Sequence, residues 1–436
     1  MTQFDQIIYP RWTLTINADN QVLENHAVAI SDGKIARILP SEEARCLNAN
    51  EKIELADHAL LPGFVNLHTH VAMTLLRGFA DDLPLMDWLN NHIWPVEKRW
   101  VSEAFVYDGT LLGMAEMLRG GVTTVNDMYY FPSAVARAGI DAGMRTFVGC
   151  VIAEFPSAYA QNAHEYLDKG LRAREQFEGE ENIMFVLAPH APYTVSEETF
   201  RKVAMLAEHE GMLVHCHIHE TRDEIAQSMK TVGMRPLAYL KKTGLLSPRL
   251  TASHMVHLTD DEIALVAQQG VSVSHNPRSN MKLSSGIAPV AALLDAGVNI
   301  GIGTDGAASN NSLDILADMR LAALLAKVNG APTAVSATTV LRMATVNGAK
   351  ALGVGDRIGS IELGKQADLI AIDLSALETI PLFDPISQIV YSANREQVTH
   401  VWVNGECLMK ERRLLKLDEQ NLREMANAWQ RKVIQS

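Results

Sequence analysis

Residues 184–220 read MFVLAPHAPYTVSEETFRKVAMLAEHEGMLVHCHIHE, a short apolar segment, a longer helical segment and a second short apolar segment. The same alternation recurs from about residue 62 to residue 364, as in LTASHMVHL followed by TDDEIALVAQQG, and NIGIGTDG followed by SLDILADMRLAALLAKV. Strands that alternate with helices at this spacing are parallel and are joined by crossover helices. About eight such units fit a closed (β/α)8 barrel better than an open sheet. We therefore expect an α/β protein with a TIM-like barrel.

The two ends of the chain have a different pattern. Residues 1–61 contain short β-branched runs broken by Asp-Gly and Asn/Asp pairs, which are hairpin signals. After Gly364, β-type runs return in QADLIAIDL and VTHVWVNGECLMKER. The simplest topology pairs both chain ends in one small β-sandwich. We predict a composite β-sandwich domain of residues 1–61 and 365–436, and a catalytic barrel domain of residues 62–364.

Composition and charge exclude several classes of function. The net charge of −13 and the lack of a concentrated Lys/Arg run argue against nucleic-acid binding, which requires a basic surface. No run of 18 or more apolar residues occurs, and the N-terminus lacks the pattern of a signal peptide. The four cysteines are far apart, which suggests neither a disulfide framework nor a thiolate zinc site. We expect a cytoplasmic protein that acts on a small molecule, without nucleic-acid or membrane partners.

The segment LPGFVNLHTH ends in two histidines. Side chains on a strand alternate between faces, so His68 and His70 point the same way at the end of the first predicted barrel strand. Active sites of barrels lie at this end of the strands, and neutral imidazoles are good ligands for zinc and similar ions. A single His-x-His pair is weak evidence for a metal site, because ordinary surface or core histidines are common.

Other predicted strand ends supply similar groups. The string LVHCHIHE places His215, His217 and His219 on one face, and not all three can bind the same ion. The string TASHMVH, with His254, ends a further strand, and GIGTDG, with Asp305, ends the last one. Imidazole or carboxylate groups at so many successive strand ends are improbable by chance. Together they indicate a metal centre.

The types of these groups suggest a reaction. Three imidazoles and one carboxylate around a divalent ion leave a position for water, whose pKa the ion lowers toward neutrality. A carboxylate beside that water can take its proton, and a neighbouring glutamate can carry a proton to a substrate nitrogen, as aromatic deamination requires. A second ion would need a bridging ligand, commonly a carbamylated lysine on the fourth strand. The candidate strand, residues 183–190, contains no lysine, so we predict one divalent ion.

The longer motifs resemble those of the amidohydrolase superfamily. They are PGFVNLHTHVAMTLLRG, HxxE from His217 to Glu220, HMVHL, SHNPRSNMKLSSGIAPV and GTDGAASNNSLDI. Within the superfamily the chain is most similar to the 5'-methylthioadenosine/S-adenosylhomocysteine deaminases, over nearly its whole length. The resemblance implies hydrolytic deamination of the adenine of 5'-methylthioadenosine to hypoxanthine, with release of ammonia. Adenosine and S-adenosylhomocysteine are further candidate substrates.

The resemblance also implies a set of metal ligands. The positions that match the family's ligands are His68, His70, His217 and Asp305. Asp305 additionally matches the base that activates the attacking water. Zn is the expected ion, although Fe, Mn and Co also suit three histidines and one aspartate.

Further positions match catalytic and substrate-binding residues of the family. Glu220 matches the proton shuttle that would protonate adenine N1 and then the leaving amine. His254 matches the histidine that orients or polarises the attacking water. Glu97 matches the carboxylate that accepts hydrogen bonds from the ribose 2' and 3' hydroxyls, and His190 matches a histidine that contacts the substrate.

Simpler interpretations of several residues are available. Glu97 lies in the segment WPVEKRW, where an exposed salt bridge would be an ordinary role, and His190 precedes a turn in which it could bond locally. His275, which precedes Asn276 and Pro277, is a further candidate for the pocket. Supporting or packing roles are expected for three other histidines: His215, His219 and His257. The loop after the first strand offers apolar side chains that would line a pocket or pack on a helix: Met73, Leu76, Phe79, Trp88 and Trp94.

The chain departs from the family pattern in one place. Some members carry arginines between the third and fourth strands, near the far end of the substrate. The matching stretch, residues 146–156, contains no arginine. A homocysteine carboxylate would favour such a cation, so its absence favours 5'-methylthioadenosine, or adenosine, over S-adenosylhomocysteine.

Two other functions compete with nucleoside deamination. An amidohydrolase of another purine, a pterin or a triazine would share the metal ligands but would not need Glu97. A non-catalytic binding protein on a barrel scaffold would have no use for a proton shuttle beside a metal. Barrels of this type commonly dimerise, so we also expect a homo-oligomer.

Overall fold

The computed structural model describes residues 3–328 and 330–435. It divides the chain into two compact units. Among the described residues, the first contains 3–66, 115–124, 314–328 and 330–418, and the second contains 67–114, 125–313 and 419–435. All residues predicted above to bind metal or substrate belong to the second unit.

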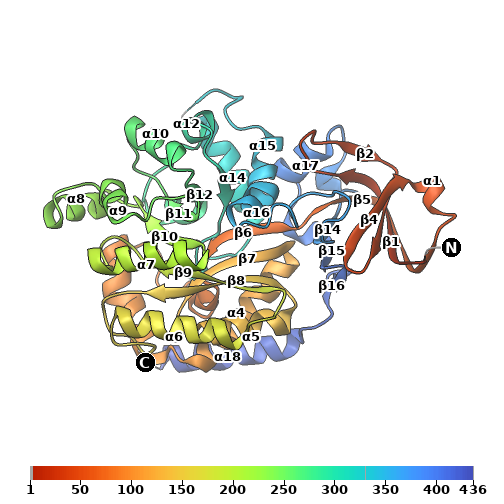
Figure 1. Cartoon of the computed structure of the whole chain (residues 1–436). Coiled ribbons are helices and arrows are strands. Elements are labelled where there is room, and N and C mark those ends of the chain that lie inside the picture. Colours follow the sequence, from red (N-terminus) through yellow and green to blue (C-terminus); the bar gives the residue numbers. More distant parts are fainter. Residues whose placement is uncertain (1–2, 329, 436) are drawn as a thin grey trace. The chain divides into compact units, whose positions relative to one another are not determined.

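Eight strands form one sheet in the order β13-β12-β11-β10-β9-β8-β7-β6, and the strands from β8 to β13 pair in parallel (Figure 1). The strands are β6 (Phe64–Thr69), β7 (Val122–Tyr129), β8 (Arg145–Ile152), β9 (Ile183–Pro189), β10 (Val214–Ile218), β11 (Leu250–His254), β12 (Ser272–His275) and β13 (Ile300–Ile302). Beyond β13, the backbone N–H of Asp305 donates to the carbonyl of His68 at 2.9 Å. This bond brings the last strand back to the first, and the predicted TIM-like barrel is confirmed.

A glycine allows this closure to be tight. A Cβ atom on Gly303 would come within 2.4 Å of Asn276 Oδ1 and 2.9 Å of the Cβ of His68. Only glycine fits between the first and seventh strands here, which is why the GTDG string begins as it does.

Helices follow the barrel strands, and polar caps fix where several of them begin. The Ser196 hydroxyl accepts from Thr199 N at the start of α7 (Glu197–Glu210), and Thr259 and Glu262 form a capping box at the start of α10 (Asp260–Gln268). The longer helices of this set are α4 (Glu103–Arg119), α5 (Pro132–Ala142), α6 (Ala163–Gln176), α7 (Glu197–Glu210), α8 (Arg222–Thr231), α9 (Pro236–Thr243), α10 (Asp260–Gln268) and α14 (Ile315–Val328). Shorter ones are α11 (Pro277–Lys282), α12 (Val290–Asp295), α13 (Ala307–Asn310), α15 (Ala337–Arg342), η3 (Met343–Asn347) and α16 (Gly348–Ala351).

The segment between β6 and α4 is long and partly helical. Its elements are η1 (Val71–Leu76), α2 (Leu85–Asp87), η2 (Trp88–Ile93) and α3 (Trp94–Trp100). Apolar side chains of this segment share one buried cluster with residues of α4 and α5, including Trp88, Phe105 and Val135. The segment is therefore packed against the barrel helices, and it can form one wall of a site at the carboxyl ends of the strands.

The strands at the two chain ends form one nine-stranded sheet, as the sequence predicts for these segments. Its strands are β1 (Gln3–Leu14), β2 (Val22–Glu24), β3 (His26–Ser31), β4 (Lys34–Pro40), β5 (Asn48–Pro62), β14 (Leu369–Asp373), β15 (Val398–Val403), β16 (Glu406–Lys410) and β17 (Arg413–Leu414). The link between the two ends is the antiparallel pair β5 and β14, with Leu61 opposite Ile370. Apolar residues of β1, β3, β5 and β15 then share one core. Short helical turns accompany this sheet: α1 (Ser41–Ala44), η4 (Leu377–Thr379), α17 (Pro385–Tyr391) and η5 (Arg395–Gln397).

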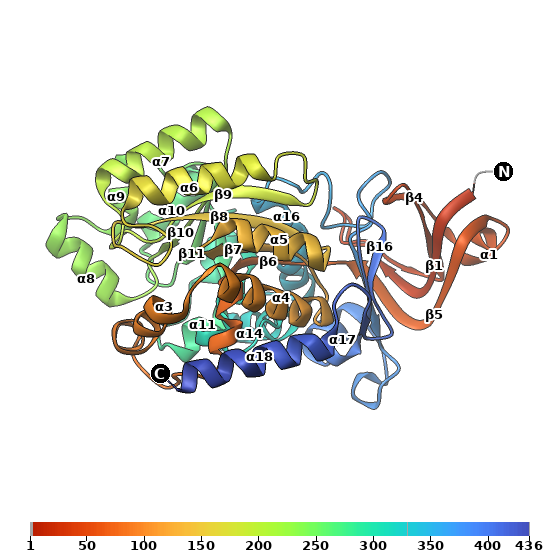
Figure 2. The ribbon, with the colours of Figure 1, turned by 90° about the horizontal axis from the view of Figure 1, so that it is seen from below.

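The last helix, α18 (Glu419–Ile434), lies along α4 (Figure 2). The Trp429 ring meets Phe105 edge-on at 5.2 Å, and its indole N–H donates to Asp108 at 2.7 Å. The domain bounds 1–61 with 365–436, and 62–364, stay a prediction. Among the described helices, none combines the length and the hydropathy needed to cross a membrane.

Candidate active site

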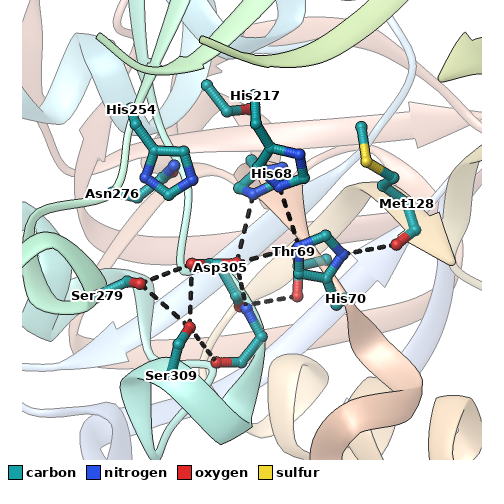
Figure 3. A network of polar contacts seen from close by, with 12 residues as sticks. His68, Thr69, His70, Met128, His217, His254, Asn276, Ser279, Asp305 and Ser309 are labelled. Carbon is teal, nitrogen blue, oxygen red and sulfur yellow. Dashed lines mark hydrogen bonds and ion pairs between the residues drawn. The ribbon is translucent and has the colours of Figure 1, made fainter. Parts of the chain in front are cut away.

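Four of the predicted side chains meet at the carboxyl ends of three barrel strands. His68 lies on β6 and His70 directly after it, His217 lies on β10, and Asp305 follows β13. The Oδ1 atom of Asp305 is 3.3 Å from His68 Nε2 and 3.2 Å from His70 Nε2. Figure 3 shows the imidazoles of His68, His70 and His217 directed at the same small space beside Asp305.

The hydrogen bonds of two of these rings show that the space fits a cation. His70 Nδ1 donates to the carbonyl of Met128 at 2.6 Å, and His217 Nδ1 donates to the carbonyl of His190 at 2.8 Å. Each neutral ring therefore carries its proton on Nδ1 and its lone pair on Nε2. The two Nε2 atoms face each other at 3.2 Å. Two lone pairs at this distance repel unless a proton or a metal ion lies between them. Against the effect of burial, the contact with Asp305 raises the pKa of His70 to about 9, so this space favours a positive charge, which a divalent ion can supply in place of the proton.

The ring of His68 is oriented by a hydrogen bond with a second buried histidine, His215. Its Nδ1 lies 2.8 Å from His215 Nε2, and a proton on Nδ1 leaves the lone pair on Nε2 for a metal. His215 is in turn 3.0 Å from the hydroxyl of Ser253 and 3.2 Å from the amide of Asn126. This is the supporting role predicted for His215.

Asp305 is fixed by hydroxyl groups that the sequence did not reveal. Its Oδ2 accepts from Ser279 Oγ at 2.6 Å and from Ser309 Oγ at 2.9 Å, and Oδ1 accepts from Gly306 N at 2.8 Å. Burial opposes ionisation of Asp305, but hydrogen bonds and charge from the neighbouring imidazoles hold its pKa well below the ordinary value. The carboxylate is thus ionised and rigid, as a metal ligand must be.

Glu220 and His254 lie beside this cluster. Glu220 Oε2 is 3.9 Å from His254 Nε2, and Glu220 Oε1 accepts from Ser285 Oγ at 3.2 Å. Burial raises the pKa of Glu220, although His254 acts in the opposite direction. A carboxyl group with a raised pKa retains its proton more readily and can donate it.

His254 faces the same space as the cluster. Its Nδ1 lies 2.8 Å from the amide oxygen of Asn280 and donates to it, so Nε2 is an acceptor. Candidate ligand atoms of His68, His217 and His254 all lie within 4.8 Å of one another. His254 is therefore placed where it can accept a hydrogen bond from a water molecule at the cluster.

A pocket opens over these residues, with about 710 Å³ of space including its mouth. Its aromatic and apolar walls include Met73, Trp88, Trp94 and Tyr129, and its polar residues include Glu97, His190, Glu220, His254 and Asp305. Two other loop residues behave differently, because Leu76 is packed in the core and Phe79 is 39% exposed.

Glu97 is buried in the pocket wall rather than paired on the surface. Tyr129 donates its hydroxyl to Glu97 Oε1 at 2.6 Å. Burial raises the pKa of Glu97 to about 7, against the opposing effect of the Tyr129 bond. A carboxylate in the wall of a pocket can accept hydrogen bonds from the hydroxyl groups of a bound ligand.

His190 both bonds locally and faces the pocket. Its Nδ1 is 3.0 Å from Thr194 Oγ1, and its ring centre is 4.9 Å from that of His217. Burial lowers its pKa to about 3, so the ring is neutral. His275 is buried, and the residues that line the pocket do not include it.

The alternation of side chains in LVHCHIHE stops after Ile218. His219 has a φ of +57°, outside the strand region, so it does not share the face of His215 and His217. Its Nδ1 donates to the carbonyl of His257 at 2.9 Å and its Nε2 accepts from Leu237 N at 3.2 Å. His219 thus packs behind the pocket.

Several functional neighbours were missed in the sequence. Tyr129 donates a hydrogen bond to Glu97, and Asp127 accepts one from Val71 N at 2.7 Å. Ser279 and Ser309 donate hydrogen bonds to Asp305. Glu224 accepts a hydrogen bond from the backbone N–H of Glu220. The string VTTVNDMY of β7 carries a weak signal for the first two, since polar residues appear at the end of an otherwise buried strand.

Known proteins are similar to this chain over nearly its full length. A 5-methylthioadenosine/S-adenosylhomocysteine deaminase of Teredinibacter turnerae is 45% identical over 434 residues, which are 99% of this chain and 98% of the relative. A 5'-deoxyadenosine deaminase of Methanothermobacter thermautotrophicus is 42% identical, with 92% and 93% covered. The solved structure of an adenosine deaminase of Xanthomonas campestris with bound zinc superposes with a TM-score of 0.98 at 49% identity, covering 100% of this chain and 99% of that one. The model of the amidohydrolase family matches residues 59–408, and this chain belongs to that family.

Proposed function

We propose that this protein is a metal-dependent hydrolase that deaminates the adenine of 5'-methylthioadenosine to hypoxanthine and releases ammonia. Adenosine and S-adenosylhomocysteine are further candidate substrates. One observation carries the proposal: a single pocket is lined by His70, His217 and Asp305 of the cluster, by Glu220 beside them and by the buried Glu97. The relatives with deaminase names support it, because they match this chain over nearly its whole length.

His68, His70, His217 and Asp305 would hold one divalent ion, for which we propose zinc. The Nε2 atoms of His70 and His217, which lie 3.2 Å apart beside the carboxylate of Asp305, support a cation there. Zinc is supported by the zinc-bound relative of known structure. The absence of lysine from β9 supports a single ion, because a bridging lysine has no place there. When bound, the ion supplies Lewis acidity that lowers the pKa of water and stabilises negative charge.

The protein's own residues would move the protons of the reaction. The acceptor Nε2 of His254 orients the water that attacks C6 of adenine, and Asp305 takes the proton that this water releases. Glu220 donates its proton to N1, so the ring accepts the new carbon–oxygen bond without building up negative charge. The proton taken from water then passes to the exocyclic amine, the carbon–nitrogen bond breaks and ammonia leaves. The C6 hydroxyl returns its proton to Glu220, which leaves the C6 carbonyl of hypoxanthine and restores the acid.

Glu97 would bind the ribose, and His190 would contact the substrate beside it. A carboxylate accepts two hydrogen bonds from the paired 2' and 3' hydroxyls, and Tyr129 fixes its orientation. The second candidate, hydrolysis of another purine, a pterin or a triazine, has no ribose for Glu97 to bind. Glu97→Ala should sharply raise KM for a nucleoside and leave a free base such as guanine unaffected. A homo-oligomer in the cytoplasm remains our prediction for the assembly and location.

The direct test is ammonia release, together with loss of the adenosine absorbance band, on metal-replete protein. The substrates are 5'-methylthioadenosine, adenosine and S-adenosylhomocysteine. Glu220→Gln should lower kcat by about 10²- to 10⁴-fold, the usual contribution of a positioned proton donor. Its zinc content, measured by elemental analysis, should match that of the wild type. Absence of turnover with every adenine nucleoside would refute the proposal.

A further inference from the structure

The two oxygen atoms of the Glu220 carboxyl group have different surroundings. Oε1 accepts a hydrogen bond from the hydroxyl of Ser285 at 3.2 Å. Oε2 lies 3.9 Å from Nε2 of His254, beside the His/Asp cluster. Glu220 and Ser285 are both buried, so the bond between them lies away from bulk water.

This difference favours one position for the proton of the acid. In a protonated carboxyl group, one oxygen is a hydroxyl that donates, and the other is a carbonyl that remains free to accept. Because the Ser285 hydroxyl donates to Oε1, it favours the form in which Oε1 is the carbonyl. The proton then lies on Oε2, on the side of His254, where the proposed proton shuttle uses it.

Ser285 is fixed by hydrogen bonds at both ends of its backbone. Its N–H donates to the carbonyl of Asn280 at 2.8 Å, and its carbonyl accepts from Nε2 of His257 at 2.7 Å. The next residue, Gly286, has a φ of +121°, and a Cβ atom there would come within 2.9 Å of Val256 Cγ1. Glycine thus lets this loop pass close to the segment that carries His257.

His257 is held in turn by the loop that carries Glu220. The backbone carbonyl of His257 accepts from His219 Nδ1 at 2.9 Å and from the guanidinium of Arg235 at 2.7 Å. Because His219 directly precedes Glu220, this set of hydrogen bonds returns to the backbone from which it started. The acid and the hydroxyl of Ser285 therefore belong to one connected unit.

The loop of Ser285 also orients His254. Nδ1 of His254 donates to the side-chain oxygen of Asn280 at 2.8 Å, and the carbonyl of Asn280 accepts from Ser285 N. The two residues that orient water and transfer a proton in the proposed reaction, His254 and Glu220, are thus bonded by the two ends of one short loop.

Ser285 lies outside the substrate pocket. Among the described residues, those that line this pocket include Glu220 and His254 but not Ser285. Ser285 instead lines a neighbouring hollow, together with Ser284 and His257. The hydroxyl of Ser285 can therefore influence the reaction through Glu220, without contact with a bound nucleoside.

From these contacts, and resting on the proposed function, we propose that Ser285 is a positioning residue of the proton shuttle. Its hydroxyl holds the carboxyl group of Glu220 so that Oε2 presents the proton to the substrate. Without this hydroxyl, the carboxyl group can rotate and carry its proton on either oxygen. The rate of the chemical step then falls, while binding of the substrate stays the same.

The test compares kcat and KM for 5'-methylthioadenosine in metal-loaded wild-type protein and its variants. Ser285→Ala should lower kcat by about tenfold, as expected for one lost hydrogen bond, and leave KM within about twofold. Ser285→Cys keeps the size of the side chain but is a weaker donor, so its kcat should be intermediate. Ser284→Ala is the matched control, because Ser284 lines the same hollow but is exposed, and its kcat should equal that of the wild type.

A double-mutant cycle separates positioning from a general structural role. Glu220→Gln removes the acid, so adding Ser285→Ala to this variant should cause no further loss of kcat. If Ser285 only stabilised its loop, Ser285→Ala would lower kcat by the same factor with and without the acid. That result would overturn the proposal.

Crystal structures of zinc-loaded wild type and Ser285→Ala test the positioning without turnover. The wild type should show one orientation of the Glu220 carboxyl group, with Oε1 at Ser285, and the variant should show a rotated or divided one. If the carboxyl group moves but no adenine nucleoside is deaminated, the reaction is wrong and the positioning role stands. If the wild type deaminates nucleosides and the variant changes neither kcat nor the orientation of Glu220, the positioning role is wrong and the reaction stands.

Discussion

The carboxyl group of Glu97 changes its charge near neutral pH. Burial raises its pKa to about 7, while the hydrogen bond from Tyr129 acts to lower it. An ionised carboxylate accepts hydrogen bonds from both ribose hydroxyls, but a protonated one loses an acceptor position. KM for a nucleoside should therefore be constant above about pH 8 and rise as pH falls through 7, by about tenfold per unit well below the pKa.

Tyr129→Phe tests the direction in which the pKa of Glu97 should move. The variant loses the bond that lowers the pKa of Glu97, so the midpoint of the KM profile should move to higher pH. Glu97→Gln should have a high KM that does not vary over the same range. A wild-type profile that is flat from about pH 8 to pH 6 would show that the charge of Glu97 does not control binding.

Single residues were predictable from sequence where both their type and their place on a strand carried information. His68, His70 and Asp305 combine a ligand side chain with a predicted strand end, and the structure brings them together with His217. Tyr129 had only a weak signal, as the last residue of an otherwise buried strand. A tyrosine at the end of a buried strand is ordinary, and its bond to Glu97 joins residues 32 positions apart, a contact that no local pattern encodes.

At the scale of elements, the junction between β10 and α8 decides where Glu220 lies. Glu224 accepts from the backbone N–H of His219 at 3.0 Å and of Glu220 at 2.7 Å. Thr221 caps the helix by accepting from Glu224 N at 3.2 Å. Because His219 is in the left-handed region, the chain turns sharply here, and Glu224 holds the turn.

Glu224→Ala should therefore affect both stability and rate. Two buried N–H groups would lose their acceptor, which costs about 2 to 4 kcal/mol in the free energy of unfolding. The displaced Glu220 should lower kcat more than it changes KM. Urea unfolding and steady-state kinetics measure the two effects. Glu198→Ala, in the exposed first turn of α7, is the control and should change neither.

Helices and strands were predictable where the period of the apolar residues and the length of the segment indicated the same type of element. Residues 184–220 show a strand, a helix and a strand in the sequence, and the structure has β9, α7 and β10 there. Residues 71–100 show no such pattern in the sequence. Their elements η1, α2, η2 and α3 are each seven residues or shorter and are stabilised by contacts with α4 and α5. The turn at His219 was also hidden, since a positive φ at a histidine depends on the bonds that Glu224 makes afterwards.

At the scale of the whole molecule, the sequence predicts which segments pair but not their register. The β-type runs of both chain ends indicate a shared sheet, and β5 pairs with β14. That β1 is parallel to β5 and antiparallel to β3 depends on cross-strand packing, such as Ile8 against Ile53. The helix α18 follows the last strand in sequence but packs on α4 through Trp429, a contact between residues more than 300 positions apart.

Removal of the metal should weaken the whole protein, because the cluster joins β6, β10 and the segment after β13. Without the ion, the cluster loses the bonds from the ion to its four ligands and keeps the contacts of Asp305 with His68 and His70 and of His70 with His217. An ion that binds only the folded state adds about 4 kcal/mol to the free energy of unfolding at a free concentration of 1,000 Kd. Chelation should therefore lower Tm and abolish deamination, and added zinc should restore both. His68→Ala, whose ion is bound weakly, should show a low Tm that chelator hardly changes. If chelated and zinc-loaded wild-type protein unfolded at the same temperature, the three segments would be joined by packing alone.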